Sequence, residues 1–237
     1  MATLLSIVQE ACDRIGLVRP TAVIGSSDDQ ARQLLSLSNQ DGKDLVRRHD
    51  WQKIVKEQTI TATATEEQTS GIPSDFARMI PGTFWNRTQD RRIAGPLSAQ
   101  RWQQLKSGLI VLPFDAFRIR GNALLMNPTP TASDALAYEY VSTCWCSSTG
   151  ETAPDQAAWV ADTDLTYLDD ELQVLGLCWR YKRARGLDFS QEFDEYETRL
   201  AHLNGVDGVQ ADLDMALGDD GSSVSAPYVQ DGNWSIN

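Results

Sequence analysis

The sequence predicts an α+β protein in which a helical bundle is interrupted by an inserted β-rich domain and followed by an extended C-terminal tail. Apolar residues recur at helical spacing near the start and in the last third of the chain, whereas the middle alternates apolar and polar side chains as strands do. The final stretch is rich in Gly, Ser, Asp and Asn. We therefore expect the bundle at 1–51 and 160–217, the inserted β-rich domain at 52–159, and a flexible arm at 218–237.

Two helices are predicted before the β-rich region. The first runs from about Thr3 to Ile15, because its apolar residues share one helical face and Gly16 follows as a stop signal. The second begins after the capping candidates at 26–29 and ends near Trp51. Each amphipathic helix needs a partner that buries its apolar stripe, which favours a bundle.

The periodicity changes at about residue 52. Thr alternates with apolar side chains over 59–65, which is typical of a strand, and a short helix is expected from Ser98 to Lys106. Further strands are expected at 83–86, 116–120, 123–126 and 136–141. The dipeptide Gly121-Asn122 between two of them predicts a hairpin turn.

Two helices are predicted after the β-rich region. The first starts at Asp169 and ends in basic residues before Gly186, as suits a helix C-terminus. The second follows the capping candidate Asp188. Its apolar residues repeat at the 4-3-4-3 spacing of a packing seam: Phe189, Phe193, Tyr196, Leu200 and Leu203.

Charge is distributed unevenly along the 237 residues. The net charge of −12 divides into −2 for residues 1–187 and −10 for 188–237, where Arg199 is the one basic residue. Such an acidic segment disfavours nucleic-acid binding, which requires Lys and Arg. No apolar run approaches the ~18 residues of a membrane span. The start lacks a basic signal-peptide region, so we expect no membrane partner and synthesis in the cytoplasm.

The sequence lacks the common motifs of catalytic and metal-binding sites. The four cysteines include no Cys-x-x-Cys pair, and Cys12 and Cys178 are expected to be small buried hydrophobes. Neither histidine belongs to a metal motif, and no nucleophile elbow or phosphate loop is present. The acidic stretch 212–222 lacks the Glu that closes a calcium loop. We therefore expect no catalytic residue, no metal and no cofactor.

Two groups of side chains leave alternatives open. Seven tryptophans could stack on sugars, although core and interface packing is favoured because several fall on apolar stripes. Arg87, Arg91 and Arg92 lie in a predicted loop, where they either meet acidic surface on a partner or are solvated.

A set of short motifs resembles one family. The set comprises Ile72-Pro73-Ser74-Asp75-Phe76-Ala77-Arg78, Phe84-Trp85-Asn86, Pro96-Leu97 before Trp102, the segment 117–128, and Tyr138-Glu139-Tyr140-Val141-Ser142 with Trp145. The set and the order of the parts resemble phage head-to-tail adaptors of the tail tubular protein A type. The resemblance covers about 3–205 and leaves 206–237 unmatched.

The resemblance implies a structural protein of the virion neck rather than an enzyme. It implies a dodecameric ring below the portal protein, with a tail nozzle or tube on the lower face and genomic DNA passing through without specific binding. Synthesis would then take place in the host cytoplasm.

Candidate binding residues lie in the acidic C-terminal part. We expect Tyr228, Val229 and Trp234 to anchor the arm on the portal or on a neighbouring subunit. The candidates for a channel face are Glu192, Glu195, Asp212 and Asp214, with a plain solvated face as the alternative.

Two other classes of function remain open. One is a carbohydrate-binding or cell-wall-degrading tail component that presents Trp and carboxylates in a groove. The other is a scaffold-type or regulatory helical protein without ring symmetry.

Overall fold

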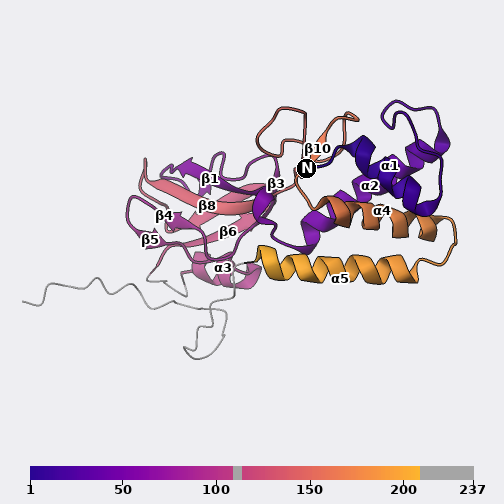
Figure 1. Cartoon of the computed structure of the whole chain (residues 1–237). Helices are drawn as coiled ribbons and strands as arrows, with labels where there is room; N and C mark the ends of the chain where they lie inside the picture. The colour runs from indigo at the N-terminus through magenta and orange to yellow at the C-terminus, as the bar shows by residue number, and fades with distance from the viewer. Residues whose placement is uncertain (109–113, 209–237) are drawn as a thin grey trace, which may run out of the picture.

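The chain folds into a mixed structure of helices and antiparallel sheets (Figure 1). The structure is a computed structural model, and it describes residues 1–108 and 114–208. Within these residues the long helices cluster on one side of the molecule, and the short helix at 99–106 lies with the larger sheets on the other (Figure 1). The expected α+β class is confirmed.

Four long helices form the helical side of the molecule. Their bounds are Leu4–Ile15 (α1), Asp29–Arg48 (α2), Asp170–Ala184 (α4) and Ser190–Asp207 (α5). Helix α4 packs against each of the other three, and its residues 172–181 are all buried. A shorter helix, α3, spans Ala99–Lys106, as expected, and a single 3-10 turn spans Gln52–Ile54.

Local signals explain where these helices begin and end. The Asp169 carboxylate accepts the Leu172 N–H at the start of α4, and Gly16 ends α1 with a left-handed φ of 79°. The expected capping role of Asp188 is wrong by one residue, since the cap position of α5 is Phe189. Asp188 instead accepts the Ser190 N–H and hydroxyl in a local turn, while the Phe189 ring packs near Trp179.

Strand β8 (Ala135–Ser142) is the centre of the main sheet. It pairs with β1 (Val55–Thr61), β3 (Phe76–Met79) and β4 (Trp85–Asn86), and β4 also pairs with β5 (Arg91–Arg92). A second sheet contains β2 (Glu67–Gln68), β6 (Ala116–Arg120) and β7 (Ala123–Asn127). A two-stranded sheet pairs β9 (Cys146–Ser147) with β10 (Leu165–Thr166).

The strand predictions are confirmed for the hairpin and for 136–141, which lies within β8, whereas other strands are shifted or shorter. Strands β6 and β7 pair across a turn in which Gly121 has a φ of 61°. The strand expected at 59–65 lies at 55–61 instead. The Gln68 side chain binds the backbone of Thr63 and Thr65, which holds that segment in a loop. The loop expected to carry Arg91 and Arg92 is strand β5.

The described residues form two apolar cores. One lies among the helices and includes Trp145 and Trp159 from the segment after β8, and the other lies between the sheets around Phe84, Phe117 and Tyr138. The tryptophans at 51, 102, 145, 159 and 179 are buried, as packing predicts, and Trp234 lies outside the described residues. All four cysteines are free and buried, which confirms the expectation for Cys12 and Cys178.

Arg78 connects the main sheet to the helices. From β3, its guanidinium donates hydrogen bonds to the backbone oxygens of Val46 (2.8 Å) and His49 (2.7 Å) and to the Asp50 carboxylate (2.7 Å). These bonds satisfy carbonyls at the C-terminus of α2 and place a positive charge at its negative end.

Replacing Arg78 with alanine is expected to lower the free energy of unfolding by about 1.5–3 kcal/mol, because charged hydrogen bonds to the end of α2 are lost. Urea denaturation of the variant and the wild type measures the change. Arg120→Ala, at the exposed end of β6, removes a guanidinium that has no such contacts among the described residues and is the matched control. Equal losses for both variants would contradict a connecting role for Arg78.

Candidate functional site

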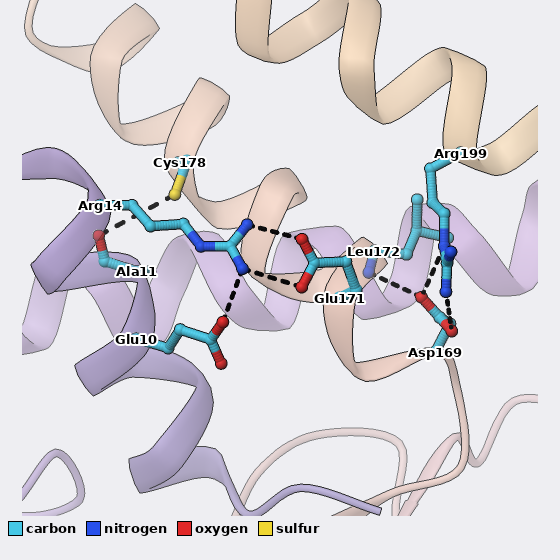
Figure 2. Close-up of polar contacts among 8 residues, drawn as sticks. All are labelled: Glu10, Ala11, Arg14, Asp169, Glu171, Leu172, Cys178 and Arg199. Atoms are coloured by element: carbon cyan, nitrogen blue, oxygen red, sulfur yellow. Dashed lines mark hydrogen bonds and ion pairs between the residues drawn. The ribbon is translucent and has the colours of Figure 1, made fainter.

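Helix α5 is held on the surface of α4 by a seam and by ion pairs. Tyr196 and Leu200 are buried, and Phe189, Phe193 and Leu203 are partly buried against the same core, so the predicted seam is confirmed. The Arg199 guanidinium pairs with Asp169 at 3.0 Å, the residue that caps α4 (Figure 2). The start of α4 and the middle of α5 are thereby joined.

The other flank of α4 is tied to α1 in the same way. The Arg14 guanidinium donates to both carboxylate oxygens of Glu171, at 2.7 and 2.8 Å, and to Glu10 on its own helix at 2.6 Å (Figure 2). Nearby, the Cys178 thiol donates to the backbone oxygen of Ala11 at 3.9 Å. Helix α4 is therefore fixed on both sides by polar contacts as well as by its core.

The outer face of α5 is polar and acidic. It surrounds a shallow depression lined by Ser190, Gln191, Asp194, Glu195, Thr198, Arg199 and His202. The channel candidate Glu195 lies on this exposed face, where its carboxylate accepts a bond from the Gln191 amide at 3.0 Å. Helix α5 thus presents one predicted channel residue to solvent.

The other predicted site residues are not brought together with Glu195. Glu192 is half-buried and forms an ion pair with Lys182 near the end of α4, and that contact holds the pKa of Glu192 below its usual value. Its charge is therefore largely compensated within the chain. Asp212 and Asp214, and the docking candidates Tyr228, Val229 and Trp234, lie outside the described residues.

A buried charge cluster lies between α2, α4 and α5, and sequence reasoning missed it. The cluster consists of Asp41, Asp44, Arg180 and Tyr196. Arg180 donates to Asp41 at 2.5 Å and to Asp44 at 2.9 Å, and the Tyr196 hydroxyl donates to Asp41 at 3.1 Å. The side chains of Asp41 and Arg180 are 1% and 4% exposed. A charged pair this deep is costly to leave unpaired.

Close packing fixes the geometry of this cluster. A Cβ atom on Gly176 would lie 2.4 Å from the Asp41 carboxylate, so only glycine fits there. The Arg180 guanidinium lies 4.3 Å from the Trp179 ring centre. One signal in the sequence could have found Asp41: it continues the helical stripe of Leu34 and Leu45 at a position where an apolar residue is expected.

Burial dominates the ionisation of Asp41. Loss of hydration raises its pKa to about 7, although Arg180 and the Tyr196 hydroxyl favour the carboxylate. Burial also raises the pKa of Tyr196, so its hydroxyl stays protonated and can donate to Asp41.

This raised pKa predicts a pH-dependent stability. Because the folded pKa lies above the unfolded one, the stability that Asp41 contributes is present in full below about pH 4 and is lost as the pH rises through about 7. Asp41→Asn cannot titrate. The wild type should therefore lose stability relative to this variant between pH 4 and 7.5, by at most about 1.4 kcal/mol per pH unit. Denaturation series at several pH values measure the difference, and a constant difference would contradict the prediction.

The exposed face of the main sheet carries a groove. This sheet groove is lined by Glu57, Thr83, Trp85, Arg87, Asp90 and Glu139, among others. Trp85 is 43% exposed, and it is the one aromatic among the large apolar side chains that the described residues expose. Sequence reasoning missed the groove as a unit, since β1, β4 and β8 contribute to it from distant parts of the chain.

The carboxylates of the sheet groove are unequally compensated. Glu57 and Glu139 lie directly opposite each other on β1 and β8, where like charges destabilise a sheet. Arg87 donates two bonds of 2.9 Å to Glu57, which holds the pKa of Glu57 below its usual value. Glu139 has no such side-chain partner among the described residues.

Among the described residues, no group of three or more His, Cys, Asp or Glu side chains could hold a metal ion. No helix in that part of the chain is long and apolar enough to cross a membrane.

Comparison with protein-family models finds no match to this chain, and comparison with curated proteins finds no relative.

Proposed function

We propose that this chain is a ring-forming adaptor of the phage neck that joins the portal protein to the tail nozzle or tube and forms part of the DNA channel. Residues 1–51 and 160–217 would form its helical bundle and 52–159 the inserted β-rich domain, with 218–237 as a docking arm. Helix α4 supports this division, because it packs on helices from before and after the main sheet.

The observation that carries the proposal is the place of the motif residues within the fold. The Asp75 carboxylate accepts bonds from Lys56 (2.8 Å), Tyr140 (2.9 Å) and Ser142 (2.8 Å), and so links β1 and β8 beside β3. Arg78, in the same motif, binds the end of α2. The residues that resemble the adaptor family are thus those that hold the sheet and the helices together, as a structural role requires.

The charge distribution supports a channel role. An acidic surface repels the DNA phosphates and lets the genome pass without being held. The net charge of −10 in residues 188–237 fits that role, and Glu195 is exposed on α5. The aromatic anchors of the arm would supply much of its affinity for the portal, because an arm that orders on binding bears an entropic cost.

Deleting residues 219–237 is expected to leave a folded protein that forms rings but binds the portal protein of the same virus more weakly. Particle images of the purified protein, alone and mixed with portal, test ring formation, and a pull-down compares the affinities. Full-strength binding by the truncated chain would contradict the docking role of the arm.

A second experiment separates this proposal from a carbohydrate function. The full-length chain is tested on a glycan array and on a peptidoglycan zymogram. Binding or lysis by a protein that stays monomeric at high concentration would overturn the adaptor proposal and favour a carbohydrate-binding or cell-wall-degrading tail component.

A further inference from the structure

The turn between α4 and α5 carries a net positive charge. Arg183 and Arg185 are exposed, and neither pairs with a carboxylate among the described residues. Leu187, next to them, is 53% exposed. These three residues are called the basic turn. Lys182 pairs with Glu192, and the Asp188 carboxylate, which accepts bonds from Ser190, offsets one of the two arginine charges, so the turn keeps a net charge of about +1.

Contacts within the chain hold these arginines in place. The Arg185 Nε donates to the Tyr181 hydroxyl at 3.2 Å, and its guanidinium lies 5.2 Å from the ring centre. The Arg183 guanidinium lies 6.0 Å from the Trp179 ring. Such contacts reduce the rotamer entropy that an arginine loses when it binds a partner.

The sheet groove has the opposite character. Its three carboxylates, Glu57, Asp90 and Glu139, share the groove with the Arg87 guanidinium, while Arg92, opposite Trp85 on β5, borders the groove at Gly82, so carboxylates outnumber guanidiniums by one. Glu139 and the exposed Trp85 lie on the same face, since Trp85 is opposite Ala137 and Glu139 is two residues further along β8. A carboxylate without a partner beside an exposed indole suits a guanidinium, which can pair with the carboxylate and stack on the ring.

The two surfaces lie at opposite ends of the molecule. In Figure 1, β4 and β5 are at one end, and the turn that joins α4 to α5 is at the other. A chain cannot fill its own groove across that separation, whereas the next copy can. Different complementary surfaces on one molecule define a head-to-tail contact, and such a contact generates a ring when its rotation closes.

We infer that the sheet groove binds the basic turn of a second copy of this chain, with Arg183 or Arg185 on Glu139 and Trp85 and with Leu187 against the indole. This inference rests on the proposed ring function and names one of the contacts that would build the ring. Charge complementarity selects the occupant: the groove is acidic, the turn is basic, and each carries one exposed apolar side chain.

Charge reversal with complementation tests the contact. The groove variant is Glu139→Arg, and the turn variant is Arg183→Glu with Arg185→Glu. Each variant alone sets like charges against each other and should raise the concentration needed for assembly by about tenfold or more. An equimolar mixture of the two should assemble again, because each altered surface then meets one of opposite charge. Glu151→Arg, at an exposed position outside the groove, is the matched control.

Native mass spectrometry and sedimentation velocity give the size of the assemblies, and melting curves check that each variant is folded. Assembly by the wild type and the mixture, but not by either variant alone, supports the contact. Unchanged assembly by both variants, or failure of the mixture, overturns the contact and leaves the adaptor proposal standing. A wild type that is monomeric at every concentration overturns both. Wild-type glycan binding that Glu139→Arg abolishes would assign the groove to a carbohydrate instead.

Discussion

Replacing Arg180 with methionine is expected to lower the free energy of unfolding by about 3–5 kcal/mol at pH 8. The unbranched side chain fills much of the space of the arginine stem, but Asp41 is left as a buried carboxylate without a counterion. Leaving Asp44 without Arg180 costs less, because its side chain is 34% exposed and water can hydrate the carboxylate. The loss of the guanidinium over Trp179 adds to the cost. Chemical denaturation measures the change.

Measuring the destabilisation at two pH values separates this electrostatic cost from the loss of packing. At pH 5 Asp41 is protonated in the wild type, whose Asp41 pKa is about 7, and also in the variant, because losing Arg180 removes a charge that favours the carboxylate; the missing counterion therefore matters less at this pH. Arg180→Met should therefore be less destabilising at pH 5 than at pH 8. Adding Asp41→Asn to the variant should recover part of the stability at pH 8, since the uncompensated charge is then absent. A cost that is independent of pH, with no recovery in the double variant, would refute the electrostatic explanation.

Replacing Leu200 with alanine is expected to destabilise the protein by about 2–5 kcal/mol, the range for truncating a large buried side chain. Leu200 is 5% exposed and belongs to the core that α5 shares with α4. Thr198→Ala, two residues away on the exposed face of the same helix, should change stability by about 0.5 kcal/mol or less. Thermal and urea denaturation give both values. An unchanged melting temperature for Leu200→Ala would contradict the packing of α5 on α4.

Periodic signals allowed much of the fold to be predicted. The seam of α5 was predicted from a repeat within a single helix, and the β6–β7 hairpin from a Gly-Asn pair between two short strands. In both cases the signal is a short-range pattern, a repeat within one helix or a turn between neighbouring strands, so the sequence itself carries it. The end of β1 was misplaced because the Gln68 side chain bonds the backbone of Thr63 and Thr65, and the cap of α5 because Asp188 forms a local turn with Ser190.

The charge cluster and the sheet groove could not be predicted because neither is local. Arg180 meets Asp41 across 139 positions of the chain, and a lone Asp on an apolar stripe does not reveal which residue compensates it. The sheet groove requires the register that sets Glu57 opposite Glu139 and Trp85 opposite Ala137. Such a register is set by tertiary pairing of strands that the sequence pattern does not match to one another. Of the candidate site residues, Glu195 and Glu192 could be placed on α5, but the pairing of Glu192 with Lys182 spans two helices.

The four buried cysteines have a practical consequence for handling the protein. Burial raises the pKa of the thiols of Cys12, Cys146 and Cys178, which disfavours the thiolate that reacts with alkylating reagents. In the native state these sulfurs should resist maleimides, and they become reactive when the chain opens. Alkylation kinetics therefore report global opening without any added probe. A single cysteine introduced on the surface could carry a fluorophore with little background labelling, so that the assembly of copies can be followed by energy transfer.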